Sequence, residues 1–134
     1  MAFECGALGS SGGQSSLEAL EELLAHLVAE DQSIEHDPIK QGESWAATTL
    51  NISRPNEAAI RQYVQVSVGG EVLALYLEDA RETLSEDQLL GKDLMLTTTL
   101  RDATDPIVND RIMSYALNEW HGIPWDETSG FIIA

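Results

Sequence analysis

The chain has 134 residues, of which 43% are hydrophobic and 22% charged, a composition typical of one globular domain and unlike that of a disordered chain. The chain has 7 Lys and Arg against 23 Asp and Glu, which gives a net charge of −16 at pH 7. Such a charge disfavours direct binding to nucleic acid or to an anionic membrane and favours a basic partner. Alternatively, the acidity only keeps the protein soluble or reflects a salty habitat. Cys5 is the only cysteine, and neither a secretory signal nor a membrane-spanning run is recognisable, so we expect a soluble cytoplasmic protein without an internal disulfide.

The chain begins with a segment rich in Gly and Ser, MAFECGALGSSGGQ, that shows no hydrophobic periodicity. We expect residues 1–14 to be a flexible tail and residues 15–134 to form a single domain. Ser15 and Glu18 have the spacing of a capping box, which predicts a helix over 15–30. Apolar side chains recur along this helix as one stripe: Leu17, Leu20, Leu23, Leu24, Leu27 and Val28.

The next segment, 31–43, is polar and contains Pro38 and Gly42, so we expect a loop there. Residues 44–52, SWAATTLNI, favour a strand, and their moderately apolar side chains on both faces indicate a place in the interior of a sheet. Pro55 is then suited to the first position of a short helical turn that ends near residue 60.

The segment 63–77, YVQVSVGGEVLALYL, is the centre of the predicted fold. Its valines alternate with polar residues, and Gly69-Gly70 can adopt the positive φ angles of a tight turn. A two-residue turn there would place Val66 opposite Leu73, with the apolar side chains of both strands on one face. We therefore predict a central β-hairpin over 63–77.

Four further elements are expected toward the C-terminus. A second capping-box pattern over 85–88 predicts a short helix, and the alternation of LMLTTTL predicts a strand over 94–100. The tripeptide Thr104-Asp105-Pro106 has the residues of a helix start, which predicts a helix over 106–120. The apolar segment 131–134 could add a last strand at a sheet edge.

These elements predict an α+β fold in a single domain. We expect a mainly antiparallel sheet of four to five strands with the 63–77 hairpin at its centre. The N-terminal helix (15–30) and the C-terminal helix (106–120) would pack on one face of this sheet.

No catalytic, metal-binding or nucleotide-binding motif stands out from the sequence. His26, His36 and His121 are far apart and form no metal-type pair, and we interpret His26 as a solvated surface residue. Cys5 lacks the basic neighbours that would activate a thiol. We therefore expect no catalytic residue, no bound metal and no cofactor.

The last predicted helix has an unusually broad apolar sector, which covers about 200° of its circumference at 100° per residue. Tyr115 lies in this sector, and Glu119 projects into it. An acid there costs free energy unless its carboxylate lies in water at the helix end or is paired. Either Glu119 is solvated, or this face extends beyond the sheet and meets a partner.

Two tryptophans flank the turn that follows the helix. Trp120 and Trp125 could anchor an interface, because tryptophan is enriched at binding hot spots, or they could simply close the core. Asp126 and Glu127 would give an acidic rim that attracts Arg or Lys. The candidate partner-binding residues are therefore Tyr115, Glu119, Trp120, Trp125, Asp126 and Glu127.

Three classes of function are compatible with these features. The first is a small acidic protein-binding module without catalytic activity, such as a chaperone, adaptor or inhibitor, that binds another protein or a second copy of itself. Its size and acidity are also those of bacterial secretion chaperones, which is an analogy in gross properties, since no family motif is recognised.

The second class is an acidic mimic of nucleic acid, or an immunity-type inhibitor, that blocks a basic enzyme. The third is a small-ligand binder or a minor enzyme. Salt separates the first two classes, because a mimic should bind with steep salt dependence, whereas a module that relies on apolar contacts should tolerate salt.

Overall fold

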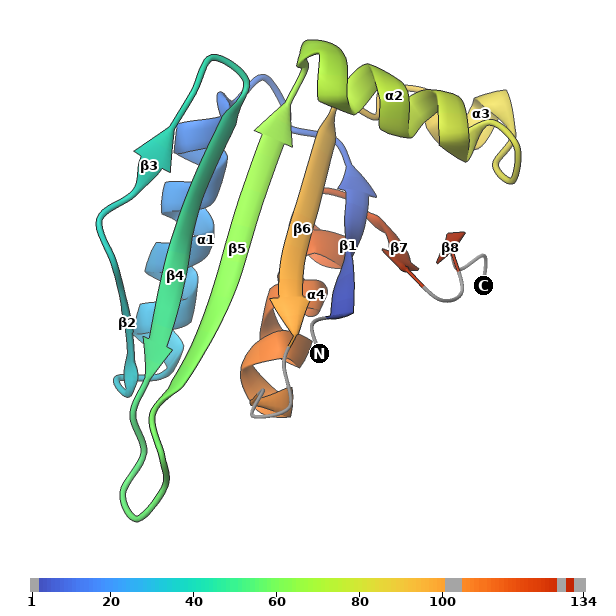
Figure 1. Ribbon diagram of the computed structural model, residues 1–134. Coiled ribbons are helices and arrows are strands. Elements are labelled where there is room, and N and C mark those ends of the chain that lie inside the picture. Colours follow the sequence, from blue (N-terminus) through green and yellow to red (C-terminus); the bar gives the residue numbers. More distant parts are fainter. Residues whose placement is uncertain (1–2, 101–104, 128–129, 132–134) are drawn as a thin grey trace.

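The computed structural model describes residues 3–100, 105–127 and 130–131, which form a small α+β domain (Figure 1). Its strands are β1 (Phe3–Gly9), β2 (Ile34–His36), β3 (Lys40–Gln41), β4 (Trp45–Ile52), β5 (Ile60–Val68), β6 (Leu94–Leu100), β7 (Ile123–Asp126) and β8 (Gly130–Phe131). Its helices are α1 (Ser16–Glu30), α2 (Gly70–Ala80), α3 (Glu86–Leu89) and α4 (Pro106–Glu119).

All strands of the described residues join one sheet, and each of their pairings is antiparallel. Seven strands follow the order β2-β4-β5-β6-β1-β7-β8, and the short β3 pairs with β4 off this path. The predicted sheet of four to five strands is therefore too small. The first strand of the chain, β1, lies in the interior of the sheet between β6 and β7 (Figure 1).

The position of β1 corrects the expected flexible tail over 1–14. β1 pairs with β6 on one side and with β7 on the other, and Leu8 is 0% exposed. A Cβ atom on Gly6 would lie 1.7 Å from the carbonyl oxygen of Leu96. The small residues that suggested a flexible segment thus allow close approach of a neighbouring strand, and the domain begins at β1 rather than at residue 15.

The predicted hairpin over 63–77 is correct as far as Val68 and wrong beyond it. Its first half is β5, but Gly69-Gly70 leads into the helix α2 instead of a second strand. Both glycines have the positive φ angles expected of them, 68° and 86°. These angles form the turn between β5 and α2 and not a hairpin turn. Helical spacing brings one set of α2 side chains into a buried cluster: Leu73, Tyr76, Leu77 and Ala80.

The two long helices begin where the capping signals predict. The capping box of Ser15 and Glu18 is present at the start of α1, with both reciprocal hydrogen bonds formed. At the start of α4, the carboxylate of Asp105 accepts hydrogen bonds from the amides of Ile107 and Val108, at 2.9 and 3.1 Å. Such caps satisfy amides that have no partner within the helix. The predicted strands over 44–52 and 94–100 are confirmed as β4 and β6, and the short helix predicted from 85–88 is confirmed as α3.

Three shorter segments differ from their predictions. The expected loop over 31–43 contains β2 and β3, which pair with β4 at the sheet edge. The expected helical turn after Pro55 is a non-helical turn in the β4–β5 connection. Phe131 belongs to the short strand β8, whereas the rest of the expected last strand, 132–134, lies outside the described residues.

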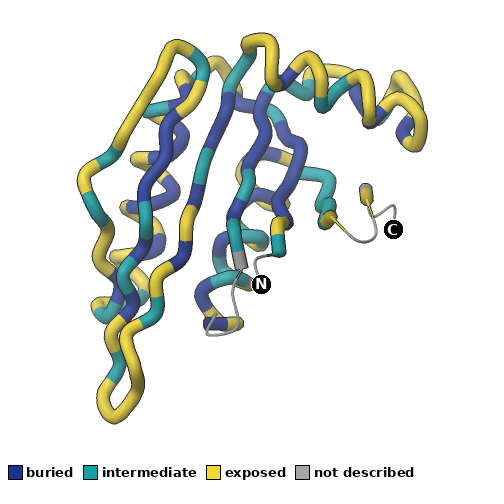
Figure 2. The backbone as a smooth tube through the Cα atoms, in the orientation of Figure 1, coloured by how far each residue is buried: buried dark blue, intermediate teal, exposed yellow. Residues whose placement is uncertain are grey.

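The two faces of the sheet are covered unequally. Helices α1 and α4 lie on one face, behind the sheet in Figure 1, and enclose the larger core cluster. On the opposite face, α2 and α3 cover only one end of the sheet, over Leu8 and Met95. The remainder of that face, along β4 and β5, carries exposed and half-buried residues such as Tyr63 and Gln65 (Figure 2).

Candidate functional site: a groove between α1 and α4

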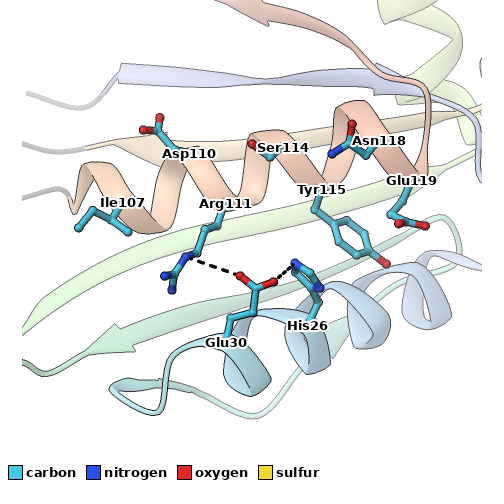
Figure 3. A pocket seen from close by; sticks show the side chains of 9 residues that line it. All are labelled: His26, Glu30, Ile107, Asp110, Arg111, Ser114, Tyr115, Asn118 and Glu119. Carbon is cyan, nitrogen blue, oxygen red and sulfur yellow. Dashed lines mark ion pairs between the residues drawn. The ribbon is translucent and has the colours of Figure 1, made fainter.

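A groove of about 420 Å³ runs between α1 and α4 (Figure 3). From α1 it is lined by His26 and Glu30, and α4 supplies the other lining residues: Ile107, Asp110, Arg111, Ser114, Tyr115, Asn118 and Glu119. The groove lies on the side of the two helices away from the sheet, since their opposite sides are buried in the core.

An ionic network fixes the two helices at one end of the groove. Arg54, in the β4–β5 connection, donates from Nη2 to Oδ2 of Asp31 at 2.9 Å and from Nε to Oδ2 of Asp105 at 2.8 Å. Asp31 is the C-cap residue of α1, and Asp105 is the N-cap residue of α4. One guanidinium therefore joins the end of one helix to the start of the other, as the planar geometry of arginine allows.

The carboxylates of this network are held in their charged form. Hydrogen bonds from the Ser33 side chain and backbone, followed by that of Arg54, lower the pKa of Asp31 from 3.8 to about 2. Burial acts to raise the pKa of Asp105, but the hydrogen bonds from Arg54 and from the first amides of α4 outweigh it and lower the pKa. The hydrogen bonds that Arg54 donates to Asp105 and Asp31 in turn raise the pKa of Arg54.

Arg111 neutralises the same end of the groove. Its Nε lies 3.7 Å from Oε2 of Glu30 (Figure 3), and its Nη1 lies 3.4 Å from Oδ2 of Asp31. Glu30 also lies 3.1 Å from Nε2 of His26, one turn earlier in α1. Glu30 and Asp31 thus have basic partners at this end, whereas the exposed Asp110 forms no ion pair with any residue that the structure describes.

The middle of the groove is aromatic. The Tyr115 ring lies with its centroid 5.1 Å from that of His26, across the gap between the helices, and 5.2 Å from that of Trp120 in an edge-on arrangement. Figure 3 shows Tyr115 and Glu119 pointing from α4 toward α1. The ring therefore forms part of the contact between the two helices and part of the groove surface.

The far end of the groove is acidic. Burial raises the pKa of the Tyr115 hydroxyl, and the negative charges of Glu22 and Glu119 raise it further. Both glutamates are exposed, and neither forms an ion pair with any residue that the structure describes. The groove thus changes from the ion pairs of Arg111 at one end to two glutamates near Tyr115, unpaired among the described residues, at the other.

The structure separates the six candidate residues named from the sequence. Tyr115 and Glu119 line the groove, and Glu119 is exposed. Trp120 is only 2% exposed and belongs to the core cluster beneath α4. A partner in the groove would therefore touch Tyr115 but not Trp120.

Trp125 lies on the other face of the sheet. Its ring stacks on Tyr76 of α2, with centroids 6.3 Å apart, and its Nε1 donates to Sδ of Met95 at 2.9 Å. Asp126 pairs in register with β1, and the carboxylate of Glu127 accepts a hydrogen bond from the backbone amide of Glu4 at 3.0 Å. Trp125, Asp126 and Glu127 therefore form no common surface with the groove.

Sequence reasoning missed seven residues of the groove: His26, Glu30, Ile107, Asp110, Arg111, Ser114 and Asn118. The spacing of His26 and Glu30 places them one turn apart on α1, but nothing in the sequence shows that α4 packs beside that turn. Among the described residues, no group of three or more His, Cys, Asp or Glu side chains is arranged to hold a metal ion. In the same part of the chain, no helix has the length and apolarity needed to cross a membrane.

The site described above is the basis for functional inference, because similarity supplies none. Comparison with known proteins found no matching family model, no matching curated protein and no matching solved structure.

Proposed function

We propose that this chain is a non-catalytic protein-binding module that takes a basic segment of a partner protein into the groove between α1 and α4. The observation that supports this function is the combination, in one groove, of exposed apolar surface with carboxylates that have no ion-pair partner among the described residues. Apolar contact would prolong the complex, and the charge would speed its formation.

The apolar part of the groove centres on Ile107. This side chain is 55% exposed in the first turn of α4, where an isoleucine gains little from the fold. Tyr115 adds a half-buried aromatic ring farther along the same helix. Large apolar and aromatic side chains that become fully desolvated on binding carry much of the energy of protein interfaces.

The negative charge of the groove adds to that of the whole protein, which is strongly acidic. A net charge of −16 produces a negative potential around the whole protein, which raises the rate of encounter with a basic partner. Salt at 0.1 M screens this electrostatic attraction at distances beyond about 10 Å. A complex held mainly by apolar contact should therefore form more slowly at high salt but retain much of its lifetime.

A matched pair of variants tests the groove. Ile107→Asp and Val72→Asp each replace a β-branched apolar residue, exposed by 55% and 54%, in the first turn of a helix. An aspartate is favoured in a first turn, so both variants should fold, and both add one negative charge. Only Ile107 lies in the groove.

The experiment captures partners from a native lysate on the immobilised protein, purifies the captured protein and measures its dissociation constant at low and high salt. We expect Ile107→Asp to weaken binding by about tenfold, or about 1.4 kcal/mol, and Val72→Asp to change it by less than about twofold. Steep salt dependence with no effect of Ile107→Asp would contradict the proposal and favour the acidic mimic. A second copy of the chain as the sole partner would contradict it in favour of a homodimer.

A further inference from the structure

We infer that the Tyr115 end of the groove binds one Arg or Lys side chain of the partner, between Glu22 of α1 and Glu119 of α4. This inference rests on the proposed function and adds the chemical group that the partner must present. It concerns one end of the groove, whereas the apolar contact at Ile107 concerns the other.

Helical spacing places the two carboxylates on facing surfaces. Glu22 lies one turn before His26 on α1, and Glu119 lies one turn after Tyr115 on α4, so each pair shares a helix face. The His26 and Tyr115 rings are in contact across the groove. The glutamates therefore flank this contact from opposite helices, and both influence the Tyr115 hydroxyl electrostatically.

No described cation is placed to neutralise this end. Arg111 is engaged with Glu30 and Asp31 at the other end of the groove. Two like charges close together repel, and a bound cation between them would remove that repulsion. The charge complementarity thus favours a positively charged occupant over a neutral or acidic one.

The chemistry of the site suits a side-chain cation. Among the described residues, the Tyr115 hydroxyl has no hydrogen-bond partner, so it can accept a bond from an N–H group. The two carboxylates are further acceptors, and the aromatic ring can attract a cation placed over its face. An ammonium with three donors or a guanidinium with five can use several of these acceptors together.

The test is an NMR titration of the folded, ¹⁵N-labelled protein with short capped peptides at physiological salt. The probes are acetyl-Gly-Arg-Gly-amide, acetyl-Gly-Lys-Gly-amide and, as the neutral probe, acetyl-Gly-Gln-Gly-amide. We expect saturable shifts of the amides around Tyr115, Glu119 and Glu22 with the two basic peptides only. Shifts that spread evenly over the acidic surface, or that the neutral peptide reproduces, would overturn the inference.

Two double variants with the same change in charge localise the effect. Glu22→Gln with Glu119→Gln should weaken binding of the basic peptides by about fivefold, since two partly exposed charge contacts are lost. Glu78→Gln with Glu82→Gln, at exposed positions in and after α2, should weaken it by less than about twofold. Equal weakening by both pairs would show that only the overall field matters, which overturns this inference while the Ile107 contact of the proposed function remains open to its own test.

Discussion

Replacement of Leu8 by alanine tests whether β1 is an interior strand. Leu8 is 0% exposed and packs in the smaller core cluster with Leu73 and Met95. The substitution removes three carbon atoms from this cluster, worth about 2.4 kcal/mol at about 0.8 kcal/mol each. The cavity left behind raises the expected loss in the free energy of unfolding to about 3–5 kcal/mol.

Such a loss is a large part of the total stability of a small domain, which is roughly 5–15 kcal/mol. Urea denaturation followed by circular dichroism and tryptophan fluorescence measures it. Leu90→Ala is the matched control, because it makes the same chemical change at a residue that is 81% exposed, and it should cost less than about 0.5 kcal/mol. A Leu8→Ala loss below about 1 kcal/mol, or one equal to that of Leu90→Ala, would refute the interior position of β1 and restore the flexible-tail interpretation.

Three further predictions test the fold. Val66→Asp places an unpaired charge in the core and should lower the free energy of unfolding by about 4 kcal/mol or more. Gln65→Asp, on the open face of the same strand, should be tolerated. Equal urea midpoints for the two variants would show that the buried and open faces of β5 are assigned wrongly. Gly6→Ala should lower the melting temperature markedly, because its Cβ atom would meet a backbone carbonyl at 1.7 Å, and an unchanged melting curve would contradict this contact. Asp31→Asn should lower stability at pH 7, because the pKa of Asp31 is depressed from 3.8 to about 2. The stability contributed by this carboxylate is present above pH 3.8 and is lost as the pH falls through about 2, so acid titration of the wild type and the variant should show their stabilities converging over that range.

The elements that the sequence predicted correctly have strong local signals. Reciprocal capping residues define the starts of α1 and α3, and Asp105 with Pro106 defines the start of α4. These signals act within a few residues, so they do not depend on the rest of the fold. The strands β4 and β6 were recognised for the same reason, from their alternation and their β-branched residues.

The errors arose where one local pattern serves two structures. The segment after Gly69-Gly70, EVLALYL, has apolar residues at spacings that fit either a strand or a helix. In the structure it is helical, and the helix brings Leu73, Tyr76, Leu77 and Ala80 together in the smaller core cluster. β1 is short of such signals, because its glycines allow close contacts with segments distant in the sequence: Gly6 lies against Leu96 of β6, and Gly9 lies against Trp120 at the end of α4. The groove was missed because it depends on the packing of α1 beside α4, and only long-range contacts such as that of Arg54 with Asp105 establish this packing.

The distribution of charge within the groove also constrains how a partner would lie in it. Each arginine that the structure describes has a carboxylate partner within the chain, so the excess of 23 Asp and Glu over 7 Lys and Arg must be balanced from outside. Along α4, the exposed apolar contact at Ile107 and the acidic end at Tyr115 are separated by eight residues, or about 12 Å of helical rise. A segment that uses both ends would need an apolar and a basic side chain at that separation, which corresponds to about two turns of a helix or to about four residues of extended chain. The spacing of these two side chains in a captured partner would therefore indicate whether that partner binds the groove as a helix or as a strand.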